Sequence, residues 1–358
     1  MSAKRIQVAT AQPYPVVVGA GVLEGLERGL PTGPAAVLTD ANVERLHAAR
    51  LGACAKLPRL VLAPGEASKS FATLELVLDF LLASGLDRSS SLIVFGGGVV
   101  GDLGGLAAAL FMRGIGLVQC PTTLLAQVDS SIGGKTAVNL RAGKNLAGAF
   151  HQPRLVLADT ETLATLPDEE LRSGLGEVVK SALLGTGKLL ERLERESGAL
   201  LARDAGLLAE VVAHCVELKA GIVARDEHER HERKLLNFGH TFAHAIERAA
   251  GFGRIPHGIA VGVGLVLALR ASERAGLLAE PELPARVARL LGLLGMPADL
   301  AALRARPGVR LAPDELLAGM RHDKKGRAAR PAFVLARGLG ELALDQELDE
   351  RTLVELLA

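Results

Sequence analysis

Histidine and glutamate residues with the spacing of metal ligands occur in the second half of the chain. His240 and His244 lie four residues apart in a segment of helical pattern, and Glu247 continues the same face. His257 follows a glycine-rich turn, and Glu177 lies on an earlier predicted helix. Imidazoles and carboxylates are ligands for Zn²⁺ or a similar ion, and three of them leave one position open for substrate. These residues predict a catalytic metal site.

Two other kinds of metal site are disfavoured. In residues 228–232, His-Glu-Arg-His-Glu, the fifth position is Glu, so the H-E-x-x-H signature of zinc proteases is absent. Cys54, Cys120 and Cys215 form no C-x-x-C pair, which argues against a cysteine zinc site and against a disulfide framework. A bound metal must therefore use His, Asp or Glu.

A glycine-rich turn follows the apolar residues 91–95. Residues 96–101 satisfy G-x-G-x-x-G, a pattern in which backbone N–H groups at a helix N-terminus approach a pyrophosphate. The acidic residue expected about 20 positions later is absent, and Asp102 lies inside the turn instead. A dinucleotide site and a purely structural turn both remain open. Residues 64–69 are either a solvated loop or part of such a site, with Glu66 on ribose hydroxyls and Lys69 near the dinucleotide.

A second glycine site, residues 132–136, resembles a P-loop. Asp129 occupies the position of the required first glycine, so nucleoside-triphosphate hydrolysis by a P-loop mechanism is disfavoured. Several cations also lie near glycine or turn residues, as a small substrate with a carboxylate and a phosphate would require. A surface ion pair is the alternative for each. These cations are Arg113, Lys135, Lys144, Lys180, Lys219, Arg233, Lys324 and Lys325.

The elements that must position these residues change in character near residue 160. Before it, predicted strands alternate with helical segments, which indicates a mostly parallel sheet with helices on both faces. After it, the pattern is almost wholly helical. We expect an α/β domain over 1–160, a helical domain over 161–358, and a ligand cleft between them. The expected strands are 5–10, 14–18, 35–39, 59–62, 91–95, 114–120, 154–158 and 332–335, and the expected helices are 74–86, 168–184, 189–219, 232–250, 259–275, 284–294 and 314–320.

Composition narrows the class of protein. The chain has 358 residues, enough for about two domains. It carries 41 Lys and Arg against 40 Asp and Glu, so no nucleic-acid surface or polybasic membrane anchor is indicated. The longest apolar run, residues 259–269, is shorter than the roughly 20 residues that cross a bilayer, and the N-terminus does not resemble a signal peptide. These features predict a soluble intracellular protein.

Three stretches together resemble the 3-dehydroquinate synthase family. They are residues 119–139, residues 236–247 and Asp323-Lys324-Lys325, and the resemblance extends in order over nearly the whole chain. It implies an α/β N-terminal Rossmann-like domain with a mostly parallel sheet, and an all-α C-terminal metal-binding domain. It also implies a cytoplasmic homodimer that acts in the shikimate pathway of chorismate and aromatic amino-acid biosynthesis.

The implied activity is a phosphate-eliminating carbon–oxygen lyase reaction. It converts 3-deoxy-D-arabino-heptulosonate 7-phosphate to 3-dehydroquinate and phosphate with NAD and one divalent ion, Zn or Co. The implied steps are transient oxidation at C5, loss of phosphate, reduction, and intramolecular aldol closure. The implied metal ligands are Glu177, His240 and His257, so His244 becomes a substrate contact.

The resemblance also implies the other site residues. NAD contacts are Asp40, Asn42, Pro64, Gly65, Glu66, Ala67, Ser68, Lys69, Gly97, Gly98, Val99, Val100, Gly101, Asp102, Thr122, Thr123, Lys135, Lys144, Thr162, Leu163, Ala164 and Thr165. Substrate contacts are Arg113, Asp129, Lys135, Asn145, Lys180, Lys219, Arg233, Asn237, His244 and Lys324, of which Lys135, Lys180, Lys219, Arg233, Asn237 and His244 are the expected catalytic residues.

Departures from the family pattern leave alternatives. Ile259 replaces a common glutamate next to His257-Gly258, which puts the orientation of His257 in question. His231 stands where glycine is common, and Ala243 replaces a glycine between the helix histidines. Another sugar-phosphate cyclase, of the amino-dehydroquinate type, is the main alternative. A metal-dependent NAD alcohol or glycerol dehydrogenase and a non-catalytic NAD-binding regulator are the others.

Overall fold

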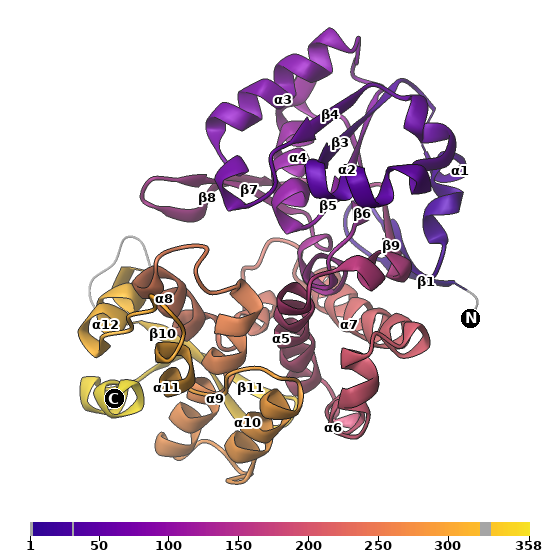
Figure 1. Ribbon diagram of the computed structural model, residues 1–358. Helices are drawn as coiled ribbons and strands as arrows, with labels where there is room; N and C mark the ends of the chain where they lie inside the picture. The colour runs from indigo at the N-terminus through magenta and orange to yellow at the C-terminus, as the bar shows by residue number, and fades with distance from the viewer. Residues whose placement is uncertain (1–2, 31, 323–330) are drawn as a thin grey trace. The chain divides into compact units, whose positions relative to one another are not determined.

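The computed structural model of the chain describes residues 3–30, 32–322 and 331–358. It divides into two compact units (Figure 1). The first unit comprises Met1–Pro167 and Arg203–His228, and the second comprises Asp168–Ala202 and Glu229–Ala358. The sequence prediction placed one boundary at residue 160. In the structure, residues 161–167 and 203–228 also pack with the α/β unit.

A seven-stranded sheet forms the centre of the first unit. Its spatial order is β1-β2-β9-β6-β5-β3-β4, and all neighbours are parallel except β1 and β2. The mostly parallel sheet predicted from the alternating pattern is therefore confirmed. The strands are β1 (Lys4–Val8), β2 (Tyr14–Gly19), β3 (Ala35–Asp40), β4 (Arg59–Leu62), β5 (Ser91–Gly96), β6 (Gly116–Pro121) and β9 (Leu155–Asp159).

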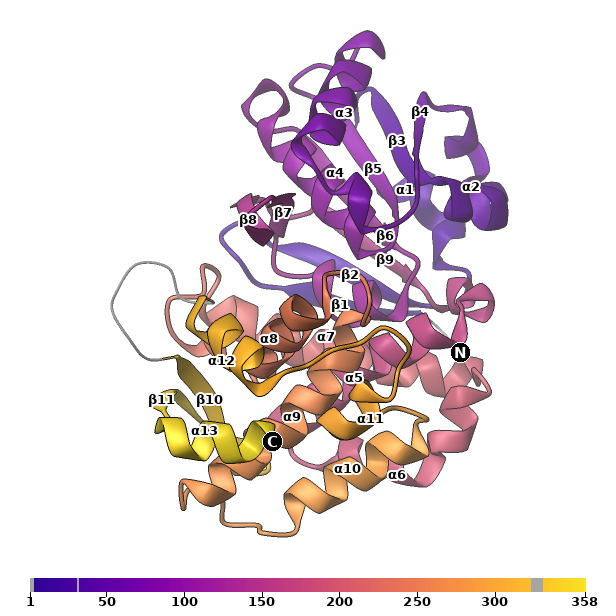
Figure 2. The same cartoon turned by 60° about the vertical axis from the view of Figure 1, so that its left-hand side comes forward.

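Both faces of this sheet are covered, as the continuous apolar run of β5 requires (Figure 2). Leu92 and Val94 point toward α3 (Phe71–Ala83) and α4 (Gly98–Leu110). Ile93 and Phe95 point to the opposite face, where α1 (Leu26–Gly29) and α2 (Ala41–His47) contribute to the core. The long helix α7 (Ala205–Arg225) packs on β1 and β2, which explains why it belongs to this unit.

A hairpin that the sequence did not predict joins the first unit. Strands β7 (Lys135–Leu140) and β8 (Gly143–Phe150) pair antiparallel, with Lys135 opposite Phe150 and Leu140 opposite Gly143. β7 packs against α3 and α4. The glycines and polar residues of this segment conceal the alternation by which a half-buried strand is recognised.

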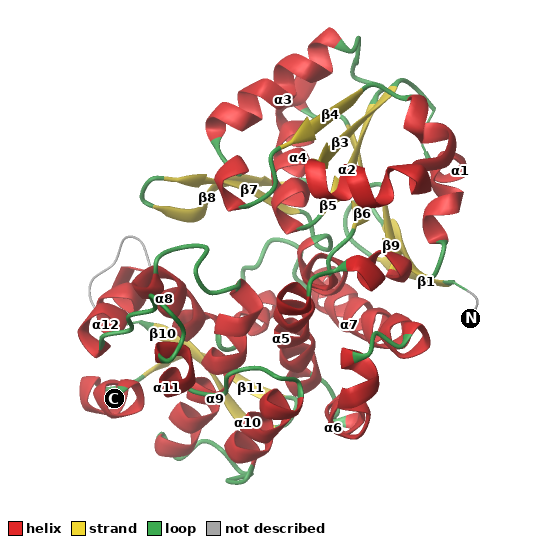
Figure 3. Cartoon of the chain, in the orientation of Figure 1, coloured by secondary structure: helices red, strands yellow, loops and turns green. Residues whose placement is uncertain are grey.

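The second unit is mainly helical, as predicted (Figure 3). A two-stranded antiparallel hairpin of β10 (Ala332–Gly338) and β11 (Glu341–Glu347) is added to the helices. The hairpin extends the strand predicted over 332–335, and the second strand was not predicted. The helices are α5 (Asp168–Leu184), α6 (Lys188–Leu201), α8 (His240–Ala250), α9 (His257–Arg274), α10 (Leu283–Leu293), α11 (Leu300–Arg304), α12 (Pro313–His322) and α13 (Glu350–Leu357).

Two predicted long helices were wrong. The helix predicted over 189–219 ends with α6, because Arg203 adopts a φ of 60° and the Asp204 carboxylate accepts a hydrogen bond from the Leu207 N–H to start α7. The helix predicted over 232–250 is a 3₁₀ segment followed by α8. Gly239, with a φ of 80°, separates the two.

The apolar run of residues 259–269 lies in α9. Among the helices that the structure describes, neither α9 nor any other combines the length and the apolarity needed to span a membrane.

Candidate functional site

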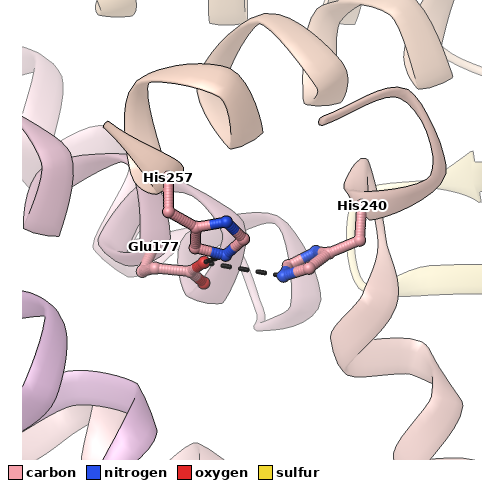
Figure 4. Close-up of side chains that lie close together, drawn as sticks. All are labelled: Glu177, His240 and His257. Carbon is pink, nitrogen blue, oxygen red and sulfur yellow. Dashed lines mark ion pairs between the residues drawn. The ribbon is translucent and has the colours of Figure 1, made fainter. Parts of the chain in front are cut away.

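Three side chains of the second unit converge on one point (Figure 4). Glu177 comes from α5, His240 begins α8 and His257 begins α9. The Oε1 atom of Glu177 lies 3.6 Å from Nε2 of His240 and 3.4 Å from Nε2 of His257. One donor atom from each residue lies within 4.8 Å of the others. The fold thus brings Glu177 close to His240 and His257, which lie 63 and 80 positions later in the sequence.

The donor set fits a divalent ion. Zn²⁺ binds His nitrogen and carboxylate oxygen at about 2.0–2.1 Å, so two ligands at a tetrahedral angle stand about 3.4 Å apart. The two distances from Glu177 Oε1 match this spacing. Two nitrogens and one oxygen leave a coordination position for substrate. The donor atom of His244 falls in a different group, with those of Glu247 and His257, so the helical neighbours His240 and His244 are not the ligand pair at this point.

Glycines next to the ligands allow the helices to approach so closely. A β-carbon on Gly176 would collide with the peptide oxygen of Gly258, and one on Gly258 would collide with the peptide oxygen of Ser173. The Ser173 hydroxyl also accepts a hydrogen bond from the Gly258 N–H, at 3.1 Å. Backbone contact between α5 and α9 therefore sets the separation of Glu177 from His257.

Charges around this point are balanced by close pairing. Glu177 is 1% exposed, and its Oε2 lies 2.5 Å from Nζ of Lys180, one helical turn along α5. Burial and the Lys180 ammonium lower the pKa of His240 well below its usual value. Burial also opposes the charged form of His257, but the carboxylates of Glu247 and Glu177 outweigh it and raise the pKa of His257 to about 10. A metal ion at this point would compete with the proton on His257.

Most of the predicted NAD residues lie in segments at one edge of the parallel sheet in the first unit, whereas Lys135 and Lys144 lie in the β7–β8 hairpin. Because parallel strands end at the same edge, the segments that follow β3, β4, β5, β6 and β9 meet there. Those segments contain Asp40, residues 64–69, residues 97–102, Thr122 with Thr123, and residues 162–165. The turn at Gly97 begins α4, so the N–H groups of its first turn face this edge.

A hydrogen-bond network connects the two loops of this edge to the β7–β8 hairpin. Lys69 Nζ donates to Asp102 Oδ2 at 2.5 Å and also to the side-chain oxygen of Asn145. Asn139 donates from Nδ2 to Glu66 Oε1 at 2.7 Å and accepts the Asn145 N–H at 3.0 Å. Burial raises the pKa of Asp102, although the Lys69 ammonium partly opposes this. The structure thus joins residues predicted for NAD with one predicted for substrate.

Other predicted substrate residues of the first unit have defined surroundings. Lys219 donates from Nζ to Asp129 twice, at 2.5 Å to Oδ1 and at 2.7 Å to the peptide oxygen. Lys135 and Arg113 are exposed. Arg113 and Asn145 have positive φ values of 68° and 55°, which non-glycine residues adopt only where their surroundings hold them.

The remaining predicted residues lie in the second unit. Asn237 donates from Nδ2 to Glu229 Oε1 at 2.9 Å. Arg233 is 1% exposed, in the 3₁₀ segment that precedes α8. The His244 ring lies edge-on to His240, with ring centres 5.5 Å apart. Lys324 and Lys325 fall outside the described residues.

Sequence reasoning missed several residues that support the site. Gln127 is fully buried, and its Nε2 lies within hydrogen-bond distance of the peptide oxygens of Pro121 and Asp159 at the ends of β6 and β9. Tyr14 accepts the Gly133 N–H at 2.9 Å, at the turn that leads to Lys135. Their partners are 6 to 119 residues away, and no local pattern indicates such pairings.

Two family models match the chain in succession. The model described as 3-dehydroquinate synthase N-terminal matches residues 59–173, and the one described as 3-dehydroquinate synthase C-terminal matches residues 174–326.

Several curated relatives are similar over nearly their whole length. The 3-dehydroquinate synthase of Caulobacter vibrioides is 47% identical over 355 residues, which cover 96% of this chain and 95% of the relative. That of Paracoccus denitrificans is 47% identical over 359 residues, which cover 97% of this chain and 96% of the relative. That of Xanthomonas campestris is 43% identical over 372 residues, with 100% and 98% covered.

Solved structures share the whole fold. A 2-deoxy-scyllo-inosose synthase, complexed with carbaglucose-6-phosphate, NAD⁺ and Co²⁺, matches with a TM-score of 0.88 and 28% identity over 99% of both chains. The 2-epi-5-epi-valiolone synthase of Streptomyces hygroscopicus, with NAD⁺ and Zn²⁺ bound, matches with a TM-score of 0.85 and 31% identity. The match covers 96% of this chain and 95% of that one. A probable glycerol dehydrogenase of Sinorhizobium meliloti matches with a TM-score of 0.66 and 17% identity, over 96% of this chain and 94% of that one. This match is a likeness of fold alone.

Proposed function

This chain belongs to the 3-dehydroquinate synthase family, and we propose that the residues described above carry out the family reaction. That reaction converts 3-deoxy-D-arabino-heptulosonate 7-phosphate to 3-dehydroquinate and phosphate, a step of the shikimate pathway. The observation that carries the proposal is the convergence of Glu177, His240 and His257 in a chain that both family models match.

These three residues would hold the divalent ion, Zn²⁺ or Co²⁺. The bound ion supplies Lewis acidity at a substrate hydroxyl and lowers its pKa. The Lys180 ammonium lies against Glu177 and offers a donor beside the same point. It can hold an oxygen of the substrate while the carboxylate and the imidazoles keep their places. His244, one turn along α8 from His240, offers a further imidazole there.

The edge of the parallel sheet would hold NAD. Bound NAD supplies the hydride acceptor and later the hydride donor, so no net oxidation results. The first turn of α4 would present backbone N–H groups to the pyrophosphate, and the Glu66 carboxylate would accept hydrogen bonds from ribose hydroxyls. Asn139 holds Glu66 in place for this role.

The cations would bind the carboxylate and the phosphate of the substrate. Lys135, Lys219 and Arg113 come from the first unit, and Arg233 and Asn237 come from the second. Because the Lys219 ammonium already neutralises Asp129, this pair presents a fixed donor geometry with little net charge. We propose that NAD is held by residues of the first unit and the metal by residues of the second.

The decisive experiment measures phosphate release from the heptulosonate phosphate. Turnover should need NAD⁺ only in catalytic amount, should stop when a chelator removes the metal, and should return on addition of Zn²⁺ or Co²⁺. Glu177→Gln should prevent the return. Accumulation of NADH in proportion to substrate, without phosphate release, would instead indicate a dehydrogenase and overturn the proposal.

A second candidate is a cyclase for another sugar phosphate. It is favoured by the likeness to the structure that contains carbaglucose-6-phosphate, which is 28% identical to this chain. The higher identity of the curated 3-dehydroquinate synthases, up to 47%, favours the first candidate. Glucose 6-phosphate offered in place of the heptulosonate phosphate should release no phosphate. Release at a comparable rate would establish the second candidate.

We further propose that the chain acts as a homodimer in the cytoplasm, as the family resemblance implies. Sedimentation of the purified protein should give twice the chain mass of 37.3 kDa, and a monomer at micromolar concentration would contradict the proposal. Cell fractionation, with an antibody against the chain, should find it in the soluble fraction rather than with membranes.

A further inference from the structure

We propose that Glu247 is a positioning residue that fixes the imidazole of His257 in the orientation and tautomer required to bind the metal. This inference rests on the proposed function only in taking Glu177, His240 and His257 as the metal ligands. It names a carboxylate outside that set and gives it a specific role.

The geometry places the His257 ring between two carboxylates. Its Nε2 lies 3.4 Å from Glu177 Oε1, and its Nδ1 lies 3.0 Å from Glu247 Oε2. Glu247 is 2% exposed and comes from α8, the helix that His240 begins. One ring thus connects the ligand point to a second buried carboxylate on the helix of another ligand.

The chemistry of the pair determines where the ring hydrogen lies. An ionised carboxylate has only acceptor oxygens, so a hydrogen bond to Glu247 requires the hydrogen on Nδ1. The Nε2 lone pair of His257 then points toward Glu177 and is available to the ion. A histidine whose second ring N–H donates a hydrogen bond to a carboxylate is also a stronger metal ligand.

The nearby position 259 on α9 offers no polar side chain that could orient the His257 ring. Ile259, two residues after His257, is 1% exposed and has no side-chain donor or acceptor. The doubt that the sequence raised about His257, with Ile259 in place of a glutamate, is answered by a residue from a different helix. Glu247 supplies the carboxylate that orients the ring.

A second arrangement of the same atoms defines the competing outcome. His244, Glu247 and His257 also place one donor atom each within 4.8 Å. If these three bound an ion of their own, Glu247 would be a ligand and the protein would hold two ions for each chain. The 3.0 Å between Nδ1 and Glu247 Oε2 is a hydrogen-bond distance and is shorter than the about 3.4 Å between two ligands of one ion, which favours the positioning role.

The first test compares Glu247→Gln with the control Glu273→Gln, which alters an exposed glutamate on α9. Co²⁺ affinity is measured by competition with a chelator, together with the Co²⁺ absorption spectrum and the number of ions per chain. We expect Glu247→Gln to bind one Co²⁺ about 10–100-fold more weakly, with a shifted spectrum. Glu273→Gln should match the wild type, which binds one ion.

The second test uses the wild-type protein and does not depend on the folding of a variant. Nitrogen NMR of the Zn²⁺-loaded protein labelled in histidine should show a hydrogen on Nδ1 of His257 and a metal-bound Nε2. Wild-type affinity and an unchanged spectrum in Glu247→Gln, a hydrogen-free Nδ1, or two ions per wild-type chain would each overturn the inference.

Failure of the inference can be told apart from failure of the proposed function. Glu177→Gln should abolish tight Co²⁺ binding if the ligand set is correct. If it does so while Glu247→Gln does not weaken binding, only the role of Glu247 is wrong. If Glu177→Gln leaves binding intact, the ligand set itself is wrong and the inference is overturned with it.

Discussion

The backbones of Gly176 and Gly258 are in contact. The peptide oxygen of Gly258 occupies the space where a β-carbon on Gly176 would stand. Each glycine is the immediate neighbour of a proposed metal ligand, Glu177 or His257. The contact between α5 and α9 is therefore also a constraint on the metal site. Local changes in helix packing should appear directly in metal affinity.

Gly176→Ala should weaken both metal binding and stability. The added methyl group must push α5 from α9, at a cost of about 1–3 kcal/mol, and must move Glu177 relative to His257. Thermal unfolding with and without Zn²⁺ measures both effects. The control is Gly198→Ala in α6, where a β-carbon meets no atom within 4 Å. It should stabilise the helix by about 0.5–1 kcal/mol. Full Zn²⁺ stabilisation in Gly176→Ala would refute the argument.

Lys135→Ala should impair substrate binding and leave NAD binding nearly intact. The side chain is exposed at the start of β7, and loss of a charge-assisted hydrogen bond to substrate costs about 1.5–3 kcal/mol. We expect kcat/KM for phosphate release to fall roughly 10- to 150-fold. The dissociation constant of NAD, from calorimetry, should stay close to the wild-type value. Equal losses in both measurements would mean that Lys135 mainly serves the cofactor.

Asn139→Ala should weaken NAD binding although Asn139 is not an expected NAD contact. The variant removes the donor to Glu66 and the acceptor for the Asn145 N–H, and each such hydrogen bond is worth about 0.5–1.5 kcal/mol. The exposed neighbour Leu140 provides the control substitution, Leu140→Ala. A dissociation constant for NAD that rises no more in Asn139→Ala than in the control would show that Glu66 does not need this support.

His47→Gln should make stability less dependent on pH between about 6.5 and 5. Burial, with the nearby Arg50, lowers the pKa of His47 in the folded chain. Below pH about 6.5 the unfolded chain takes up a proton that the folded chain does not, so the free energy of unfolding falls as pH falls, by at most about 1.4 kcal/mol per pH unit. Urea unfolding midpoints across this range measure the slope. Parallel slopes for variant and wild type would contradict the prediction.

The sequence could predict the parallel sheet and the identity of the chemical groups. Alternating apolar runs and helical segments predict the strands that bring residues 64–69 and 97–102 to one edge. His240, His244 and His257 predict a metal site because three imidazoles lie within 18 positions, flanked by glycines. The choice of Glu177 and His257 over His244 came from the family resemblance, since helical spacing alone favours His240 with His244.

The supporting contacts could not be predicted, because they join residues far apart in the chain. Asn139 contacts Glu66 across 73 positions, and neither lies in a pattern that implies the other. The role of Glu247 depends on which way the His257 ring faces, which α8 and α9 determine only after they pack. The break before α7 was within reach of the sequence, because Asp204 is a typical helix N-cap residue.

The return of α7 to the α/β unit has a consequence for the synthesis of the chain. The ribosome releases the first unit's amino-terminal 167 residues, then α5 and α6, and only afterwards the helix that covers β1 and β2. Until residue 225 has emerged, those two strands lack their helical cover, and a fragment ending at Pro167 would keep that apolar surface exposed permanently. The first unit can therefore complete its folding only after α7 has emerged from the ribosome. A fragment that ends at Pro167 should aggregate.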